Sequence, residues 1–344
     1  MNRLIFLIFI ISIVFFSSCE KILMKPNPDT DNKSIFNEYA TIIQEKYAML
    51  EAKNVDIKYL RDSIEKIITD DLSEEELFNK LTIITARLRD GHTSLSIINE
   101  KHYSYDFYST YPPGFSLFTL SNHYLIGSSM KSIEGGELGI KVAYGFLPQS
   151  TDIGYIWVPS WDIELTDDEI EMIFKEVKDA KGLILDMRQN TGGDPALSSK
   201  FAGYLTDKEV YLGYENFKHG PGANDFSKNK IYLKPANSEN KFLKPVLVIT
   251  DRLCFSATTT LLYSVKPLEN VRTIGQRSGG GSGGFSDGYL ANGWQYQLST
   301  SEFIDYLGNH LDDGVDPDIS VALDTTMKAT DEVIERAISE LSSN

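Results

Sequence analysis

The sequence predicts an α/β protein with a mostly parallel sheet, preceded by a small helical unit. Three apolar runs typical of buried strands, at residues 182–188, 245–250 and 270–275, alternate with helix-like segments in the second half of the chain. Strand–helix–strand units of this kind build parallel sheets with right-handed crossovers. The first half instead begins with segments whose apolar residues recur at helical spacing. With 344 residues, the chain is long enough for a core of ordinary size.

The N-terminus has the features of a lipoprotein signal peptide. Arg3 precedes an apolar block at residues 4–16, which is short for a membrane span but suits the core of a signal peptide. Small residues stand directly before Cys19, which resembles the lipobox of bacterial lipoproteins. We expect a signal peptide over residues 1–18 and lipidation of Cys19, with the protein held on a membrane of the cell envelope and facing the periplasm or the exterior. The alternative is a plain secretory signal with an incidental cysteine.

Composition excludes several kinds of partner and cofactor. The net charge of −16 argues against nucleic acid and against anionic lipid surfaces, so the lipid anchor is the expected membrane contact. Cys254 is the only other cysteine, so no internal disulfide is expected. The five histidines are scattered and none has the spacing of a zinc site, so we expect no metal and no cofactor.

The expected organisation after the signal peptide has three parts. Residues 19–34 are rich in polar residues and proline and predict a flexible tether. Residues 35–95 predict a helical unit, in which Ser73 and Glu76 have the spacing of a capping box. Residues 96–344 predict one larger α/β domain. It begins with short strands and turns, and then contains helices at residues 166–180, 195–205, 256–265 and 330–341.

The glycine-rich stretch at residues 278–284 contains a formal G-x-G-x-x-G. A dinucleotide site requires a helix directly after these glycines, whereas a strand-like run follows here, so the nucleotide interpretation fails. Residues 278–288 are instead expected to line a cleft or to act as a lid.

Ser256 directly follows a buried strand and stands at the start of a predicted helix. A serine there is most often a cap, but the free N–H groups of a helix N-terminus also suit a nucleophile that forms an oxyanion. The loop at residues 189–194 contains Gly192 and Gly193 and follows the preceding strand. In a parallel sheet both loops leave the same edge, where active sites collect, which favours a site over a cap.

Four segments in order resemble the tail-specific, or C-terminal-processing, serine peptidases: GLILDMRQNTGGD, KPVLVITDRLCFSATTTLL, TIGQRSGGGSGG and DDGVDPDIS. The chain is most similar to the tricorn-protease and interphotoreceptor-retinoid-binding-protein-like branch. The resemblance implies a crotonase-like core and Ser256 as the nucleophile. It also implies an oxyanion hole formed by the N–H groups of Ala257 and of Gly192 or Gly193. No PDZ module is evident, so substrate choice would depend on the cleft itself.

The base and the acid follow from the same resemblance. Where the processing peptidases carry a catalytic lysine this chain has Gln276, which cannot act as a base, so the tricorn-like branch implies His92 instead. The expected position of the acid holds Leu311. We therefore favour Asp312 as the residue that orients His92, with Asp313 and Glu302 as alternatives, and each of these would otherwise be a solvated surface charge.

The sequence thus predicts a lipid-anchored serine endopeptidase that acts on peptides or unfolded proteins through an acyl-enzyme. Two alternatives stay open. One is a catalytically silent ligand- or peptide-binding protein on the same scaffold, and the other is an esterase of small acyl substrates that uses the same residues.

Overall fold

The computed structural model describes residues 28–108, 115–126, 129–222, 224–322 and 330–343. The expected signal peptide, Cys19 and most of the expected tether lie outside the described residues. The helices are α2 (Asn32–Lys46), α3 (Ile57–Glu65), α4 (Glu74–Leu88), α5 (Leu117–Thr119), the π-helix η1 (Leu120–Leu125), α6 (Asp167–Val177), α7 (Pro195–Gly203), α8 (Ala257–Val265) and α9 (Glu332–Ser342). The strands are β1 (Ser94–Ile97), β2 (Lys101–Ser104), β3 (Lys131–Glu134), β4 (Ile140–Phe146), β5 (Ile153–Trp157), β6 (Gly182–Asp186), β7 (Val210–Lys218), β8 (Phe226–Leu233), β9 (Val246–Thr250), β10 (Val271–Gly275), β11 (Phe285–Tyr289), β12 (Gln295–Ser299), β13 (Ser301–Asp305) and β14 (Ile319–Ser320).

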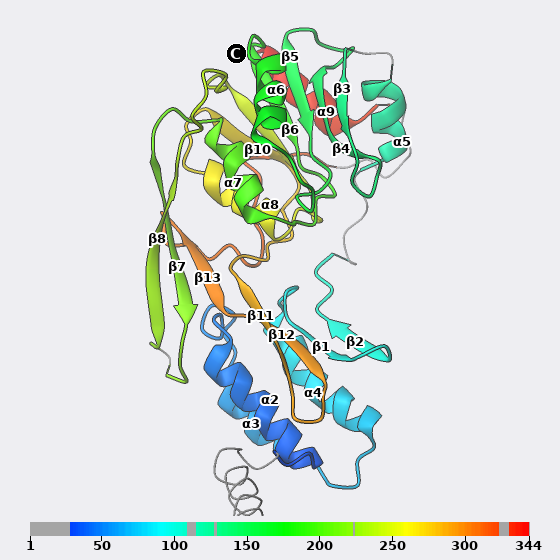
Figure 1. Cartoon of the computed structure of the whole chain (residues 1–344), viewed down its shortest axis with the longest axis vertical. Helices are drawn as coiled ribbons and strands as arrows, with labels where there is room; N and C mark the ends of the chain where they lie inside the picture. Colours follow the sequence, from blue (N-terminus) through cyan, green and yellow to red (C-terminus); the bar gives the residue numbers. More distant parts are fainter. Residues whose placement is uncertain (1–27, 109–114, 127–128, 223, 323–329, 344) are drawn as a thin grey trace, which may run out of the picture.

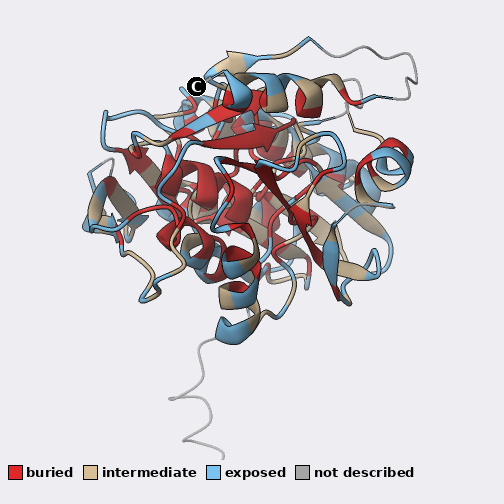
Figure 2. Cartoon of the chain, turned by 90° about the horizontal axis from the view of Figure 1, so that it is seen from above, coloured by how far each residue is buried: buried red, intermediate tan, exposed pale blue. Residues whose placement is uncertain are grey.

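The predicted α/β class with a large, mostly parallel sheet is confirmed. Seven strands lie in the order β14-β10-β9-β6-β5-β4-β3, and the first five of these run parallel to one another. The central strands are buried along their whole length, because helices α6, α7 and α8 cover one face of the sheet and α9 covers the other. Figure 2 shows the buried residues gathered in this sheet and its flanking helices.

Local start signals place several helices where the sequence predicts them. Ser73 and Glu76 form the expected capping box of α4, and Thr166 forms another at the start of α6. Asp194 caps α7, with Pro195 at its first position. The first helix, α2, ends at Lys46, and a turn follows it up to position 54.

The N-terminal helices share a hydrophobic core with a four-stranded antiparallel sheet of order β11-β12-β1-β2. Strands β11 and β12 come from late in the chain, and Trp294 and Tyr296 pack into the core of the helices. This core therefore combines the N-terminal helices with Leu290, Trp294, Tyr296 and Leu298 from late in the chain. Figure 1 shows these strands beside α2 and α4, away from the large sheet.

A third sheet, of order β13-β7-β8, lies beside α7 and α8 and extends toward the N-terminal helices (Figure 1). No sequence signal predicts it, because β7 and β8 are partly exposed and carry mixed polar and apolar residues. None of the helices in the described ranges is long and apolar enough to cross a membrane.

Candidate active site

The two loops that the sequence singles out meet at one edge of the large sheet. Strands β6 and β9 are parallel neighbours, so the loops that follow them leave the sheet side by side. The carbonyl of Asn190 accepts hydrogen bonds from the main-chain N–H of Phe255 (3.2 Å) and from the hydroxyl of Thr258 (2.9 Å). The loop before α7 therefore holds the start of α8 in place.

Ser256 occupies the N-terminal position of α8 but does not cap it. Its side chain accepts no hydrogen bond from the helix, and its backbone has a φ of 55° and a ψ of −117°. This conformation is costly for a residue with a side chain and persists only when the surroundings enforce it. The strained turn after a buried strand leaves the hydroxyl free for another partner.

That partner is His92, whose Nε2 lies 3.0 Å from Oγ of Ser256. The structure thus brings together the two residues that the sequence analysis names as nucleophile and base. His92 follows the C-terminus of α4, where Arg89 adopts the left-handed conformation and ends the helix. Its main-chain N–H donates to Oδ1 of Asp90 (2.8 Å), which fixes the local turn.

The imidazole of His92 lies in an apolar environment. It is 7% exposed, and the rings of Phe255 and Phe285 lie 4.7 and 5.1 Å from it, centroid to centroid. Burial lowers the pKa of His92, and the nearby carboxylate of Asp90 opposes this effect only in part. The imidazole is therefore neutral at pH 7, the state in which a ring nitrogen accepts a proton.

The glycine-rich segment lines the site and is held in place at its start. The carbonyl of Gly280 accepts from the main-chain N–H of Ser256 (3.0 Å), and Gly279 N–H donates to the carbonyl of Cys254 (2.8 Å). Residues 279–282 are buried, while residues 285–289 continue as strand β11. The segment is thus part of the wall around Ser256.

The expected oxyanion donors differ in what their N–H groups contact. Gly192 lies against Ser256, since a Cβ placed on it would be 2.7 Å from Cβ of Ser256. Its own N–H is engaged by Oδ1 of Asn190 (3.0 Å). Within the described chain, the N–H groups of Gly193 and Ala257 have no hydrogen-bond partner. These two groups are therefore available to a ligand.

Asp312, the favoured acid, is buried next to the glycine-rich segment. Its Oδ1 accepts from the N–H of Ser282 (3.1 Å), and its carboxylate pairs with the buried ammonium of Lys53. Burial and the neighbouring Asp90 raise the pKa of Asp312 to about 7, against the effect of Lys53. The structure does not bring its carboxylate into hydrogen-bond contact with His92, whose Nδ1 is buried without a partner among the described residues.

The two alternative acids contact other groups. Asp313 is largely exposed and also pairs with Lys53. Glu302 accepts from the amide of Asn216 (2.8 Å) and lies 3.3 Å from Nδ1 of His310. This contact raises the pKa of His310. Neither carboxylate reaches His92, so the assignment of the acid stays a prediction.

Sequence reasoning missed two charged residues that the structure places near the pair. Asp90 is 1% exposed and also accepts from the hydroxyl of Thr93 (3.0 Å). Asp90 stands two residues before His92, the spacing of an Asx turn, and this spacing could have indicated its contact with the His92 N–H. Lys53 is 2% exposed, and its stretch of sequence is an ordinary polar loop without any signal.

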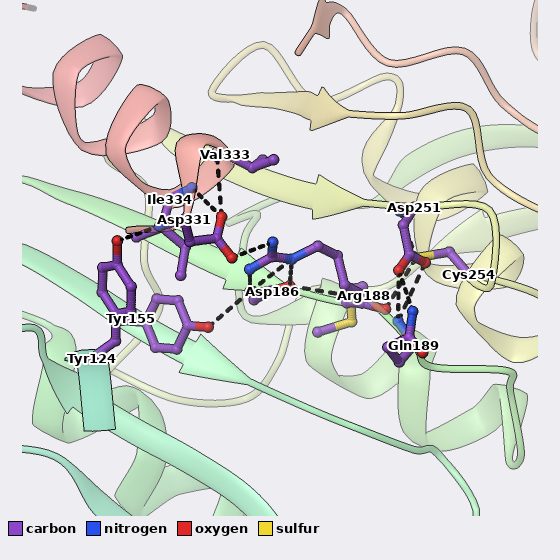
Figure 3. A network of polar contacts seen from close by, with 11 residues as sticks. Tyr124, Tyr155, Asp186, Arg188, Gln189, Asp251, Cys254, Asp331, Val333 and Ile334 are labelled. Atoms are coloured by element: carbon purple, nitrogen blue, oxygen red, sulfur yellow. Dashed lines mark hydrogen bonds and ion pairs between the residues drawn. The ribbon is translucent and has the colours of Figure 1, made fainter. Parts of the chain in front are cut away.

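A buried ion-pair network lies at the end of β6, directly before the loop at residues 189–194 (Figure 3). Arg188 lies 2.6 Å from Asp186 and 2.7 Å from Asp331. Asp331 in turn caps α9 through the N–H groups of Val333 and Ile334. Asp186 and Arg188, in the segment GLILDMRQNTGGD, therefore have a structural role, because they join the end of β6 to α9.

Cys254, two residues before the nucleophile, is fully buried. Its thiol donates to the carbonyl of Met187 (3.0 Å), and burial raises its pKa well above the ordinary range. It is a packed side chain next to the site. Among the described residues, no three His, Cys, Asp or Glu side chains are grouped so that they could hold a metal ion.

Comparisons with known proteins identify the family of this chain. The model of peptidase family S41 matches residues 152–321. A crystal structure of a candidate peptidase from Parabacteroides merdae is 32% identical, with a TM-score of 0.82, over 91% of this chain and 97% of that one. The chain belongs to peptidase family S41. It is a hydrolase of the serine-peptidase type.

More distant members of the S41 fold cover a similar share of the chain. Mature CPAF has a TM-score of 0.63 at 13% identity, over 90% of this chain and 96% of that one. The photosystem II D1 C-terminal processing protease has a TM-score of 0.53 at 14% identity, over 90% and 97%. At these identities the likeness shows the fold. A search of curated proteins found no match.

Proposed function

We propose that this S41 peptidase cleaves peptide bonds through an acyl-enzyme, with Ser256 as nucleophile and His92 as general base. The observation that carries the proposal is the 3.0 Å contact between Nε2 of His92 and Oγ of Ser256. The neutral imidazole accepts the hydroxyl proton as Oγ attacks the substrate carbonyl. It then returns this proton to the leaving amine, and water hydrolyses the ester in the same way.

The oxyanion of each tetrahedral intermediate requires hydrogen-bond donors that are already in place. We assign this role to the N–H groups of Gly193 and Ala257. The N–H of Gly192 is a weaker candidate because the side chain of Asn190 already engages it. Gly192 instead provides the space in which Ser256 and the substrate carbonyl approach each other.

Positioning of His92 depends on carboxylates that do not contact its ring nitrogens. Asp90 acts on the imidazole electrostatically and holds its backbone. We propose Asp312 as a second positioning residue, because it lies next to Asp90 and behind the segment that binds Ser256. Both carboxylates would stabilise the imidazolium that forms in the transition state.

The test is peptide cleavage read by mass spectrometry on a mixed peptide pool. We would compare the wild type with Ser256→Ala and His92→Ala, and with Ser339→Ala and His102→Ala as exposed controls of the same residue types. Loss of cleavage by about 10³-fold or more in the first two variants alone supports the mechanism. Cleavage that survives in His92→Ala contradicts the choice of base. A folded wild type that cleaves nothing in the pool favours the binding-protein or esterase alternative.

We also propose that the chain is a lipoprotein anchored through Cys19 in the bacterial cell envelope, and that its large sheet belongs to the crotonase-like class. The anchor is supported by the apolar block and the small residues before Cys19. Incorporation of labelled palmitate, lost in Cys19→Ala, would support it. A wild-type protein that stays unlabelled would contradict it.

A further inference from the structure

A pocket of about 520 Å³ lies beside the candidate active site, between α7, α8 and the three-stranded sheet. Its walls are mainly apolar and aromatic, and they include Leu212, Ile231, Leu233, Tyr263 and Phe303. Its polar lining includes one carboxylate, two ammonium groups and three hydroxyl groups, from Glu215, Lys200, Lys234, Ser199, Thr260 and Ser264. A concave, mostly apolar cavity with a few polar groups is the usual form of a site for a side chain or small ligand.

The pocket opens next to both loops of the active site. Thr260 lines it and lies one helical turn after Ser256, whose carbonyl accepts from the Thr260 N–H (3.1 Å). Pro195 and Ala196 line it from the start of α7, two and three residues after Gly193. A peptide whose carbonyl reaches Ser256 therefore carries a neighbouring side chain to the mouth of this pocket.

Glu215 faces the pocket and is tied to the glycine-rich segment. Its Oε1 accepts from the hydroxyl of Ser301, which in turn accepts from the N–H of Gly284 (2.6 Å). Tyr214 and Asn216 line a separate pocket on the opposite face of the same sheet, as alternation along a strand requires. The carboxylate is thus held in one direction by a short chain of hydrogen bonds.

The charge of Glu215 is not balanced by a protein cation. Within the described parts of the chain no Lys, Arg or His lies within 4.0 Å of its carboxylate, and burial raises its pKa. Lys200 and Lys234 also line the pocket, but both are exposed, neither pairs with Glu215, and Lys200 pairs with Asp167. A carboxylate desolvated in this way gains most from a ligand that brings a cation.

We propose that this pocket receives one side chain of the peptide substrate and selects a long basic one, lysine or arginine. The aliphatic part packs against the apolar walls, and the cationic end pairs with Glu215. This inference rests on the proposed function, since it concerns the substrate of the same site. Basic side chains suit such a pocket because a long apolar stem carries their charge.

Binding to the full-length Ser256→Ala protein tests the pocket without turnover. The probes are acetyl-Ala-Ala-Xaa-Ala-Ala-amide peptides in which Xaa is lysine, norleucine or glutamate, and the readout is Kd by calorimetry. We expect lysine to bind about tenfold more tightly than norleucine, since a charge-assisted hydrogen bond contributes about that factor. Glu215→Gln should abolish this difference, whereas Glu209→Gln, on an exposed residue outside the pocket, should keep it.

The wild type then gives the cleavage sites in the mixed peptide pool. Cuts concentrated beside lysine and arginine, and dispersed in Glu215→Gln, support the proposal. Equal binding of the lysine and norleucine peptides, or tighter binding of the glutamate peptide, would overturn it even if the wild type cleaves other peptides. Failure of all cleavage would instead count against the proposed function, while the Kd ratios would still decide the pocket.

Discussion

The ammonium group of Lys53 is buried against the carboxylate of Asp312, and both side chains are less than 5% exposed. The same ammonium donates to the carbonyl of Arg89 (3.2 Å), and the Arg89 guanidinium donates back to the carbonyl of Lys53 (2.6 Å). Lys53 therefore joins the segment before His92 to the turn that contains Asp312. It links the N-terminal helices to the part of the chain that holds the nucleophile.

Lys53→Met should lower the free energy of unfolding by about 3–5 kcal/mol, because removing one partner of a buried pair leaves the other charge uncompensated. The double variant Lys53→Met/Asp312→Asn should lose less than the sum of the two single changes, since no buried charge is then left unpaired. Asparagine keeps an acceptor for the N–H of Ser282. Urea unfolding of the four proteins measures this coupling, and simple additivity would contradict it.

Gly192→Ala should reduce kcat by about 10²-fold or more while the protein stays folded. Gly192 has a φ of 116°, and an added Cβ would lie 2.7 Å from Cβ of Ser256, so the nucleophile must move. Gly293→Ala is the matched control, because Gly293 also has a positive φ (86°) but has no atom within 4 Å of such a Cβ. Equal activity of the two variants would show that the close approach at Gly192 is not needed.

The pH dependence of kcat/KM should show an acidic limb below the ordinary imidazole pKa. Only neutral His92 accepts the proton of Ser256, so activity is present above the lowered pKa of His92 and is lost as the pH falls through it. Asp90 favours the protonated imidazole, and the carboxylate of Asp312 is paired with Lys53.

Asp90→Asn should therefore move this limb to still lower pH, apart from any loss in maximal rate. Asp287→Asn, an exposed change on β11, should leave the limb in place. A wild-type limb above pH 6.5 would contradict a buried, neutral base.

Arg188→Met should destabilise the protein by about 3–5 kcal/mol, because Asp186 and Asp331 would both lose their buried cation. Arg188→Lys should recover part of this loss, since one ammonium cannot reproduce the forked contacts of a guanidinium. Arg336→Met removes an exposed pair with Glu340 and should change stability by less than about 1 kcal/mol. Chemical unfolding distinguishes the three variants, and similar losses in all of them would refute the structural role of the network.

Sequence predicted those parts of the molecule that local signals specify. The capping box at Ser73, the helix start at Asp194 and the apolar runs of β6 and β9 are each contained within a few residues. Once β6 and β9 are parallel neighbours, the meeting of their loops follows from topology. The contact between His92 and Ser256 followed only from the family resemblance, because no local pattern connects two residues so far apart.

Long-range pairing is what the sequence could not provide. Strand β12 pairs with β1 across most of the chain, and β11 pairs with β12. The alternation of apolar and polar residues in these strands does not indicate which strand is the partner. For the same reason Lys53 reads as a surface lysine until the fold buries it against Asp312. No sequence pattern predicts the second contact of Asp312, in which it accepts a hydrogen bond from the N–H of Ser282.

His92 and Ser256 are 164 residues apart, and residues 152–321, which the S41 family model matches, contain the serine but not the histidine. A chain emerging from the ribosome therefore carries His92 long before Ser256 has been made. In the folded chain the late strand β12 pairs with β1, which begins two residues after His92. The contact between the two side chains therefore cannot exist in a chain that ends before residue 256.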